Sequence, residues 1–264
     1  QVIESVNKLK FITNVSVNGT WQWLDIGQVK GYAHSHLLHM SGQAESGRMS
    51  AGSASVVCGL ALENFGVSDL NLSRNDFYEV GARAATRLLM TNDRLQRVDL
   101  HDCKLGCLGI QEVGKGISAC ASGVPLNNVV LAFNLRDDDD SRANAAELTK
   151  ALSSLFSSPL CPLELNLKAN NLGTILEPQQ FSQVANSIGG SSNALVNLNL
   201  SVNDLSDTFG EALGNAVGRN GTLTALNVST NRLAEKASSA FANAITSSRC
   251  ALKSLNLVNN RLGI

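Results

Sequence analysis

The chain has 264 residues, a formal net charge of −1 and 44% hydrophobic residues. Because its charges nearly cancel, we expect no direct binding of nucleic acid, which needs a surplus of Lys and Arg to neutralise phosphates. No apolar run reaches the roughly 18 residues that a membrane-spanning helix requires, so we expect no membrane span.

The N-terminal part, residues 1–49, is predicted to be irregular and to contain a hairpin. Two β-rich runs, 11–17 and 20–26, flank Asn18-Gly19, which is a strong signal for a two-residue hairpin turn. We expect this segment to serve as a cap or a linker for the region that follows. The alternative is a divergent copy of the repeat described below, with its strand at Ile12, Val15 and Val17.

Two stretches inside this part and just after it have unusual composition. His34, His36 and His39 lie close together, but a shared zinc ion would need further ligands, and no cysteine or carboxylate lies in the local sequence. We therefore predict a polar loop there and no metal site. Residues 41–55 are rich in Ser, Gly and Ala, which is typical of a flexible linker, and their later part also suits the start of a helix.

The most informative feature is a phrase that recurs seven times between Val67 and Leu262. Counting places from its first apolar residue, places 1, 4 and 6 are apolar, place 9 is usually asparagine, and place 11 is usually leucine. The steps between copies are 28, 31, 36, 33, 28 and 29 residues. The copies begin at Val67, Leu95, Leu126, Pro162, Leu195, Leu223 and Leu252.

This spacing predicts a short strand, a turn and a helix in each copy. Places 4 and 6 alternate as a strand demands, so they point inward while places 3, 5 and 7 point outward. An asparagine at place 9 can satisfy backbone donors and acceptors that the turn leaves buried, so stacked copies would form a ladder, with Cys103 as a weaker substitute in the second copy. Gly81, Gly109 and Ala237 stand six residues after place 9, where a small residue would let a helix start pack closely.

Seven copies in this register resemble leucine-rich repeats, and their length resembles the ribonuclease-inhibitor-like subclass. The resemblance implies an α/β fold, a solenoid or horseshoe with one short parallel strand and one helix per repeat. We expect it to cover residues 50–264 with about seven repeats. Because the sequence stops at Ile264, two residues after the last leucine of the seventh copy, we also expect the domain to be truncated at its C-terminus.

The remaining motifs do not indicate an enzyme. Asp137–Asp140 lacks the glycine and the distal glutamate of a calcium loop, so we predict a solvated loop or a helix start. Gly114-Lys115-Gly116 lacks the rest of a phosphate-binding motif, and no Ser/His/Asp set nominates a nucleophile. We predict no catalytic activity, no cofactor and no metal.

The cysteines favour a cytoplasmic location. A cytoskeletal or other large assembly is one setting there that we consider. The six cysteines lack the paired pattern of an extracellular capping module, so we expect reduced thiols. Six Asn-x-Ser/Thr sequences point the other way, but three of them arise from the repeated phrase Leu-Asn-Leu-Ser, and we interpret them as coincidental. The six sites are Asn14, Asn18, Asn71, Asn199, Asn220 and Asn227, and the three within the repeat are Asn71, Asn199 and Asn227.

The outward places form three columns along the expected concave sheet. These columns are charged in the first two copies and small and neutral in the last three. Ordinary solvated strand positions are one interpretation, and the helical side, the loop edges and the N-terminal segment with its tryptophans stay open as binding surfaces. The candidate partner-binding residues are Asp69, Arg74, Arg97, Asp99, His101, Asp102 and Phe133.

The resemblance implies a non-catalytic protein–protein interaction module or scaffold, acting as a structural subunit of a larger intracellular assembly. Two alternatives follow from the same resemblance. One is a GTPase-activating regulator similar to the Ran-directed leucine-rich-repeat family, and the other is the ligand-sensing region of a larger receptor. The identity of the protein partner is not encoded in any motif that we can identify.

Overall fold

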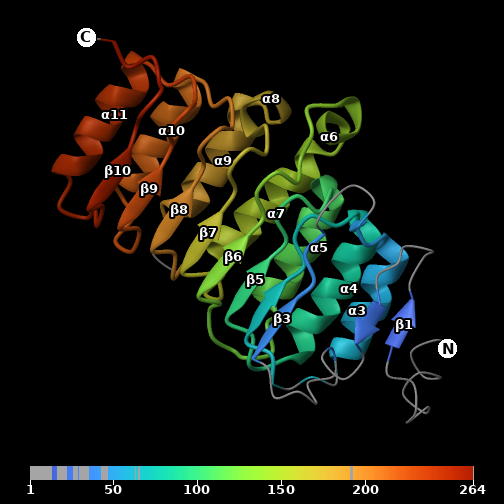
Figure 1. Ribbon diagram of the computed structural model, residues 1–264. Coiled ribbons are helices and arrows are strands. Elements are labelled where there is room, and N and C mark those ends of the chain that lie inside the picture. Colours follow the sequence, from blue (N-terminus) through green and yellow to red (C-terminus); the bar gives the residue numbers. More distant parts are fainter. Residues whose placement is uncertain are drawn as a thin grey trace.

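The repeated phrase folds into one parallel sheet whose strands follow one another in chain order (Figure 1). The computed structural model describes residues 14–16, 23–25, 29, 36–42, 47–62, 64, 66–190 and 193–263. Each strand of this sheet has three residues. The strands are β3 (Leu37–His39), β4 (Asp69–Asn71), β5 (Arg97–Asp99), β6 (Asn128–Val130), β7 (Glu164–Asn166), β8 (Asn197–Asn199), β9 (Ala225–Asn227) and β10 (Ser254–Asn256).

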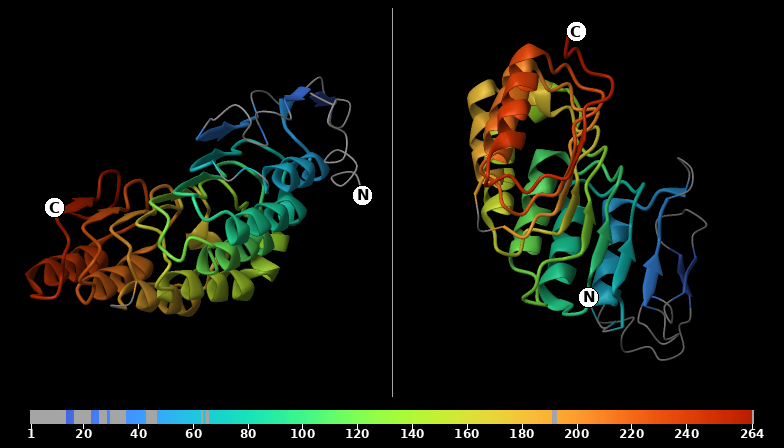
Figure 2. Two further views of the ribbon diagram at one scale, coloured as in Figure 1. Left: turned by 90° about the horizontal axis from the view of Figure 1, so that it is seen from below. Right: turned by 90° about the vertical axis from the view of Figure 1, so that its left-hand side faces the viewer.

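A layer of helices covers one face of this sheet, and the strands lie on the inner side of the curved body (Figure 2). Consecutive long helices contact each other in chain order. The long helices are α3 (Ala51–Ala61), α4 (Tyr78–Thr91), α5 (Gly106–Ser118), α7 (Ala145–Ser157), α9 (Pro178–Ile188), α10 (Asp207–Val217) and α11 (Glu235–Thr246), and the short ones are α6 (Asp139–Ala143) and α8 (Leu172–Ile175). The chain is therefore an α/β leucine-rich-repeat solenoid, as the repeat pattern predicted.

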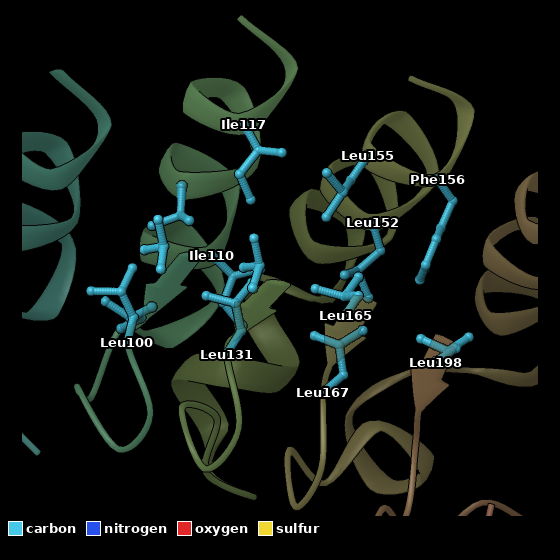
Figure 3. Packing of buried hydrophobic residues seen from close by; sticks show 14 of the residues in the cluster. Leu100, Ile110, Ile117, Leu131, Leu152, Leu155, Phe156, Leu165, Leu167 and Leu198 are labelled. Atoms are coloured by element: carbon cyan, nitrogen blue, oxygen red, sulfur yellow. The ribbon is translucent and has the colours of Figure 1, made fainter. Parts of the chain in front are cut away.

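The strand register matches the numbering of places. Leu70 pairs with Val98, and Val98 pairs with Val129, so place 4 lies beside place 4 in neighbouring coils. Side chains at places 4 and 6 point toward the helices and pack against helical residues such as Ile110 and Leu152 (Figure 3). Each fully buried aliphatic side chain of this kind contributes about 1.5–3 kcal/mol to stability. The core is thus a continuous layer along the solenoid rather than a single centre.

The predicted asparagine ladder is confirmed at place 9. The side-chain amide of Asn170 donates to the backbone carbonyl of Leu131 in the preceding coil at 3.0 Å, and the backbone N–H of Asn170 donates to the side-chain oxygen of Asn203 at 2.9 Å. Cys103 takes part as expected, because its thiol donates to the carbonyl of Leu72 at 3.1 Å. The ladder pairs backbone groups that the turn would otherwise leave unsatisfied in the core.

Place 8 has an unusual backbone in all seven copies. Its φ lies between 51° and 59°, in the left-handed region that most residues avoid. This conformation ends the strand and directs the place 8 N–H to the place 7 carbonyl of the next coil, as from Phe133 to Lys168 at 3.0 Å. The place 8 residues are Arg74, Asp102, Phe133, Ala169, Val202, Thr230 and Asn259. Because the turn points them away from the core, these side chains form a rim beside the concave face.

Small residues allow the helices to stack closely, as the sequence predicted. A Cβ added to Gly109 would lie 2.9 Å from the Cβ of Leu105 and 3.4 Å from that of Ala82 in the neighbouring helix. A Cβ on Gly210 would lie 2.5 Å from the Cβ of Ala237, which is itself buried. The close approach of successive helices therefore depends on these positions lacking larger side chains.

The N-terminal part differs from the sequence prediction in one respect. Strand β1 (Asn14–Ser16) pairs antiparallel with β2 (Trp23–Asp25), which confirms the expected pairing, while the turn between them lies outside the described residues. The polar loop predicted around the histidines is wrong at its end, because Leu37–His39 forms β3 and pairs with β4. The prediction failed because this coil lacks the leucine-rich phrase. The parallel sheet consequently begins before residue 50.

The linker and acidic stretches also take defined structure. Ser50 caps α3, its side chain accepting from the backbone N–H of Ser53 at 3.3 Å, so the later part of 41–55 starts a helix. Residues 43–46 lie outside the described residues. Asp138 caps α6 by accepting from the N–H of Ser141 at 2.9 Å, and the whole acidic run is exposed. The prediction of a solvated helix start is confirmed.

Candidate protein interaction surface

The candidate residues come from the outward places of the β4 and β5 coils and from the rim at place 8. Asp69 and Arg97 occupy place 3 of neighbouring strands, Asp99 occupies place 5, and His101 occupies place 7. The parallel register aligns equal places, so these side chains share the concave face of adjacent coils. The structure thus brings together residues that are separated by about thirty positions in the sequence.

Two of the acidic candidates are held by internal ion pairs. Arg97 Nε lies 3.6 Å from a carboxylate oxygen of Asp69, and His39 Nε2 lies 3.6 Å from the other oxygen. His39 was not among the sequence candidates because its segment carries no recognisable repeat. Since Arg97 and His39 are more than half exposed, this group is a surface network that contributes little to stability.

Asp102 is held more tightly, by a residue that the sequence did not nominate. Arg48 donates to its carboxylate at 2.5 Å and to its backbone carbonyl at 3.3 Å, and Arg48 also lies 3.5 Å from Asp76. Lys104 pairs with the same Asp76 oxygen at 2.7 Å. The hydrogen bond to Asp102 is the main cause that raises the pKa of Arg48. No sequence signal indicated this cluster, because Arg48 lies in the Ser/Gly/Ala-rich stretch.

Asp99 has a structural role that it shares with asparagines elsewhere in the sheet. Its side-chain oxygen accepts from the backbone N–H of His101, two residues ahead, at 2.8 Å. Asn166, Asn199 and Asn227 make the same contact at place 5 of their own coils, each at 3.0 Å. Asp99 therefore differs from these asparagines mainly in its charge, and Asp99→Asn isolates that charge.

The remaining candidates form one contiguous strip across four coils. The backbone N–H of Arg74 donates to the carbonyl of His101 at 2.6 Å, and the rings of His101 and Phe133 meet edge to face with centroids 5.0 Å apart. The ammonium of Lys168 lies 5.9 Å from the centroid of the Phe133 ring. We call Arg74, His101, Phe133 and Lys168 the cationic–aromatic strip. Lys168 was not selected from the sequence, although its position at place 7, beside place 8 of the preceding copy, was the available signal.

Phe133 is the large apolar side chain of this strip, and 46% of its surface is exposed. Its left-handed backbone, with φ of 59°, fixes the ring on the rim instead of in the core. At the other end of the sheet, the outward positions of β9 and β10 carry Ala225, Asn227, Ser254 and Asn256, which are small and uncharged. The chemical variety of the concave side is thus concentrated in the first coils.

The described part of the chain holds neither a membrane-spanning helix nor a metal-binding cluster. Every helix there is too short or too polar to cross a lipid bilayer. Within the same residues, no three side chains of His, Cys, Asp or Glu converge in a way that would hold a metal ion. Burial raises the pKa of the Cys58 and Cys161 thiols to about 12, so both are protonated at neutral pH.

No protein family model matches the chain, and no curated protein matches it. Among solved structures, an internalin from Listeria monocytogenes matches with 12% sequence identity, covering 99% of this chain and 88% of that chain, with a TM-score of 0.36. The fold assignment accordingly stands on the repeat register, the ladder and the layer order described above.

Proposed function

We propose that this chain is a non-catalytic protein-interaction module that binds a protein partner through the concave face of its first coils. The observation that carries the proposal is the concentration of exposed charged and aromatic side chains between β4 and β7, in contrast with the small neutral residues of β9 and β10. Interfaces draw most of their binding energy from a few aromatic and arginine side chains, so the first coils are the favoured contact region.

We further propose a scaffold role in a larger intracellular assembly, without nucleic acid as a direct partner. The buried, unpaired cysteines support a reducing environment. A strand and a helix of 11–14 residues per coil in most repeats support the ribonuclease-inhibitor-like subclass. We retain the division into an N-terminal part, 1–49, and a repeat domain, 50–264, as a proposal about function, although β3 connects the two through the sheet.

The proposal is tested by blocking one face at a time. Val130 lies at place 5 of β6, where Asp99 and Asn166 of the neighbouring strands accept a backbone hydrogen bond through their side chains. Valine makes no such bond, so Val130→Arg adds bulk and charge to the concave face without removing a hydrogen bond. Val80 in α4 is 56% exposed on the helical side, so Val80→Arg is the matched control. Partner capture by affinity purification with quantitative mass spectrometry, using full-length protein, is the measurement.

We expect Val130→Arg to abolish recovery of stoichiometric partners and Val80→Arg to preserve it. Circular dichroism melting of both variants checks that each is folded. If Val80→Arg abolishes recovery and Val130→Arg does not, the helical face is the binding surface and the proposal is wrong. Stimulation of GTP hydrolysis by a small GTPase in the presence of the purified chain would contradict the non-catalytic role.

A further inference from the structure

We infer that the cationic–aromatic strip recognises an extended protein segment in which acidic residues flank an aromatic or large apolar residue. This inference rests on the proposed function and names the chemistry of the partner. The evidence is the local arrangement of Arg74, His101, Phe133 and Lys168, which combines two cations with an aromatic pair in which Phe133 is exposed and His101 is partly buried.

The two cations at the ends of the strip differ from two other cations of the first coils. Arg97 is paired with Asp69, and Arg48 with Asp102. Among the described residues, by contrast, the structure places no carboxylate within ion-pair distance of Arg74 or Lys168. Arg74 is exposed, and Lys168 lies over the Phe133 ring, where the cation–π contact leaves its ammonium hydrogens available to an acceptor. Their charge is therefore available to a partner without breaking an internal pair.

The aromatic pair between them supplies the apolar contact. Phe133 is almost half exposed, and the edge of its ring is supported by His101. A rigid exposed ring held by a constrained backbone binds a partner at low cost in conformational entropy, because little freedom remains to be lost. An aromatic or large aliphatic side chain packed against Phe133 would remove apolar surface from water on both sides of the contact.

The spacing of the strip determines the expected motif. Arg74 and Lys168 lie in coils that are three strand steps apart, which corresponds to about 14 Å at the usual spacing of about 4.8 Å between strands. An extended peptide advances about 3.3 Å per residue, so two acidic residues about four positions apart would reach both cations. Phe133 lies two strand steps from Arg74 and one from Lys168, so the peptide residue about three positions from the acid at Arg74 would lie over its ring.

Neighbouring carboxylates favour a protein partner over nucleic acid. Asp99 and Asp102 lie beside the strip; among the described residues Asp99 has no ion-pair partner, whereas Asp102 is paired with Arg48. A continuous phosphate backbone would have to pass these acids, whereas a peptide can place single carboxylates opposite the two cations. The chain's net charge of −1 acts in the same direction.

The test is selection of a random-peptide phage display library on the full chain, followed by affinity measurement of the enriched peptides by fluorescence anisotropy. The first variant, Arg74→Asn with Lys168→Gln, removes both charges, and asparagine tolerates the left-handed backbone at position 74. The second variant, Phe133→Asn, removes the ring with the same tolerance. Arg87→Gln with Lys150→Gln, on helices α4 and α7, is the control with an equal change in net charge.

We expect enriched peptides with two acidic residues flanking an aromatic or large apolar one. Their affinity should fall at least about tenfold in each strip variant and stay unchanged in the control. Enrichment of peptides without acidic residues, no enrichment at all, or equal weakening in the control would overturn the inference. If a single-stranded oligonucleotide at low concentration displaces the selected peptides, the inference is also overturned, and nucleic acid is the favoured ligand.

The inference and the proposed function can fail separately. If Val130→Arg abolishes recovery of the natural partner while both strip variants bind that partner as the wild type does, the concave face is the binding surface but the strip is not its anchor. If the strip variants lose the peptide and Val130→Arg still captures the natural partner, the strip has the inferred chemistry but the proposed function is wrong.

Discussion

The side-chain oxygen of Asn134 accepts a hydrogen bond from the backbone N–H of Cys103 in the preceding coil, at 2.9 Å. The amide nitrogen of the same side chain donates to the carbonyl of Leu100 at 2.8 Å. One buried side chain therefore satisfies a donor and an acceptor of the neighbouring coil. Each place 9 residue thus stabilises the coil before it, which couples the stabilities of neighbouring coils along the solenoid.

We predict that Asn134→Ala lowers the free energy of unfolding by about 3 kcal/mol, because buried backbone groups of the preceding coil lose their partners. Asn260→Ala is the matched control, since Asn260 makes equivalent contacts in a coil that is only partly buried. Water can replace its contacts, so we expect a loss of about 1 kcal/mol or less. Urea denaturation measures both, and equal losses would show that the ladder is not the cause.

A second prediction concerns the carboxylate of Asp207, which caps the helix of the next coil. It accepts from the backbone N–H of Ala237 at 2.8 Å and of Ala234 at 2.9 Å, and its second oxygen accepts from Lys236 N–H at 3.1 Å. Burial alone would raise the pKa of Asp207, but these donors outweigh it and hold the pKa below its ordinary value of 3.8. We expect Asp207→Ala to cost about 1–2 kcal/mol at neutral pH.

The sign of its pH dependence follows from this depressed pKa. The contribution of Asp207 is fully present above its unfolded pKa and is lost as the pH falls through the lower folded value. The stability difference between wild type and Asp207→Ala should thus be constant near neutrality and shrink below about pH 4. Asp204→Asn, which breaks an exposed pair with Arg232 at 2.9 Å, should change stability by less than about 0.5 kcal/mol. A difference that grows in acid would contradict the assignment.

A third prediction tests the close packing of the helices. A Cβ on Gly214 would lie 2.7 Å from the Cβ of Ala240 in α11, whereas a Cβ on Gly114 would meet nothing closer than 4.0 Å. We expect Gly214→Ala to destabilise the chain by about 1–3 kcal/mol through overpacking. Gly114→Ala should be neutral or stabilising by up to about 1 kcal/mol, because alanine is the better helix former. Thermal melting of the two variants, which share the same chemical change, separates packing from propensity.

The fourth prediction uses the cysteines as reporters of unfolding. Burial raises the pKa of Cys103 and Cys107 to about 12, and both side chains are shielded from solvent. Cys250, in contrast, is only partly buried at the last coil. With Ellman's reagent at neutral pH, we expect fast reaction at Cys250 alone and reaction of the buried thiols only in denaturant. Fast labelling of Cys103 in native protein would show that the ladder opens locally.

The sequence allowed the architecture to be predicted because every repeat expresses the same local rule. Leu70, Val98 and Val129 lie at equal places and become neighbours in the sheet once the coils stack. The sequence did not predict the strand at Leu37–His39, which adds an eighth coil before the seven repeats. This coil lacks the repeated phrase, so only its pairing with β4 identifies it.

The candidate surface was predictable in its position and not in its electrostatics. The sequence selected Asp102 as a candidate, but its ion pair joins it to Arg48, 54 residues away. Among the described residues, Arg74 and Lys168 have no ion-pair partner, because the nearby carboxylates of Asp69 and Asp102 pair with Arg97 and Arg48. That outcome depends on side-chain reach across stacked coils, which no local pattern encodes.

By itself, the sequence determined the period of the chain, the inward places, the asparagine ladder and the small residues at the helix contacts. Each of these follows from steric and hydrogen-bonding requirements of a single coil, so the corresponding residues recur from copy to copy. Only the tertiary structure decided the left-handed rim at place 8, the neutralised acids of the first coils and the exposed ring of Phe133 between two cations. These depend on contacts between coils, because their geometry arises when one repeat is placed against the next.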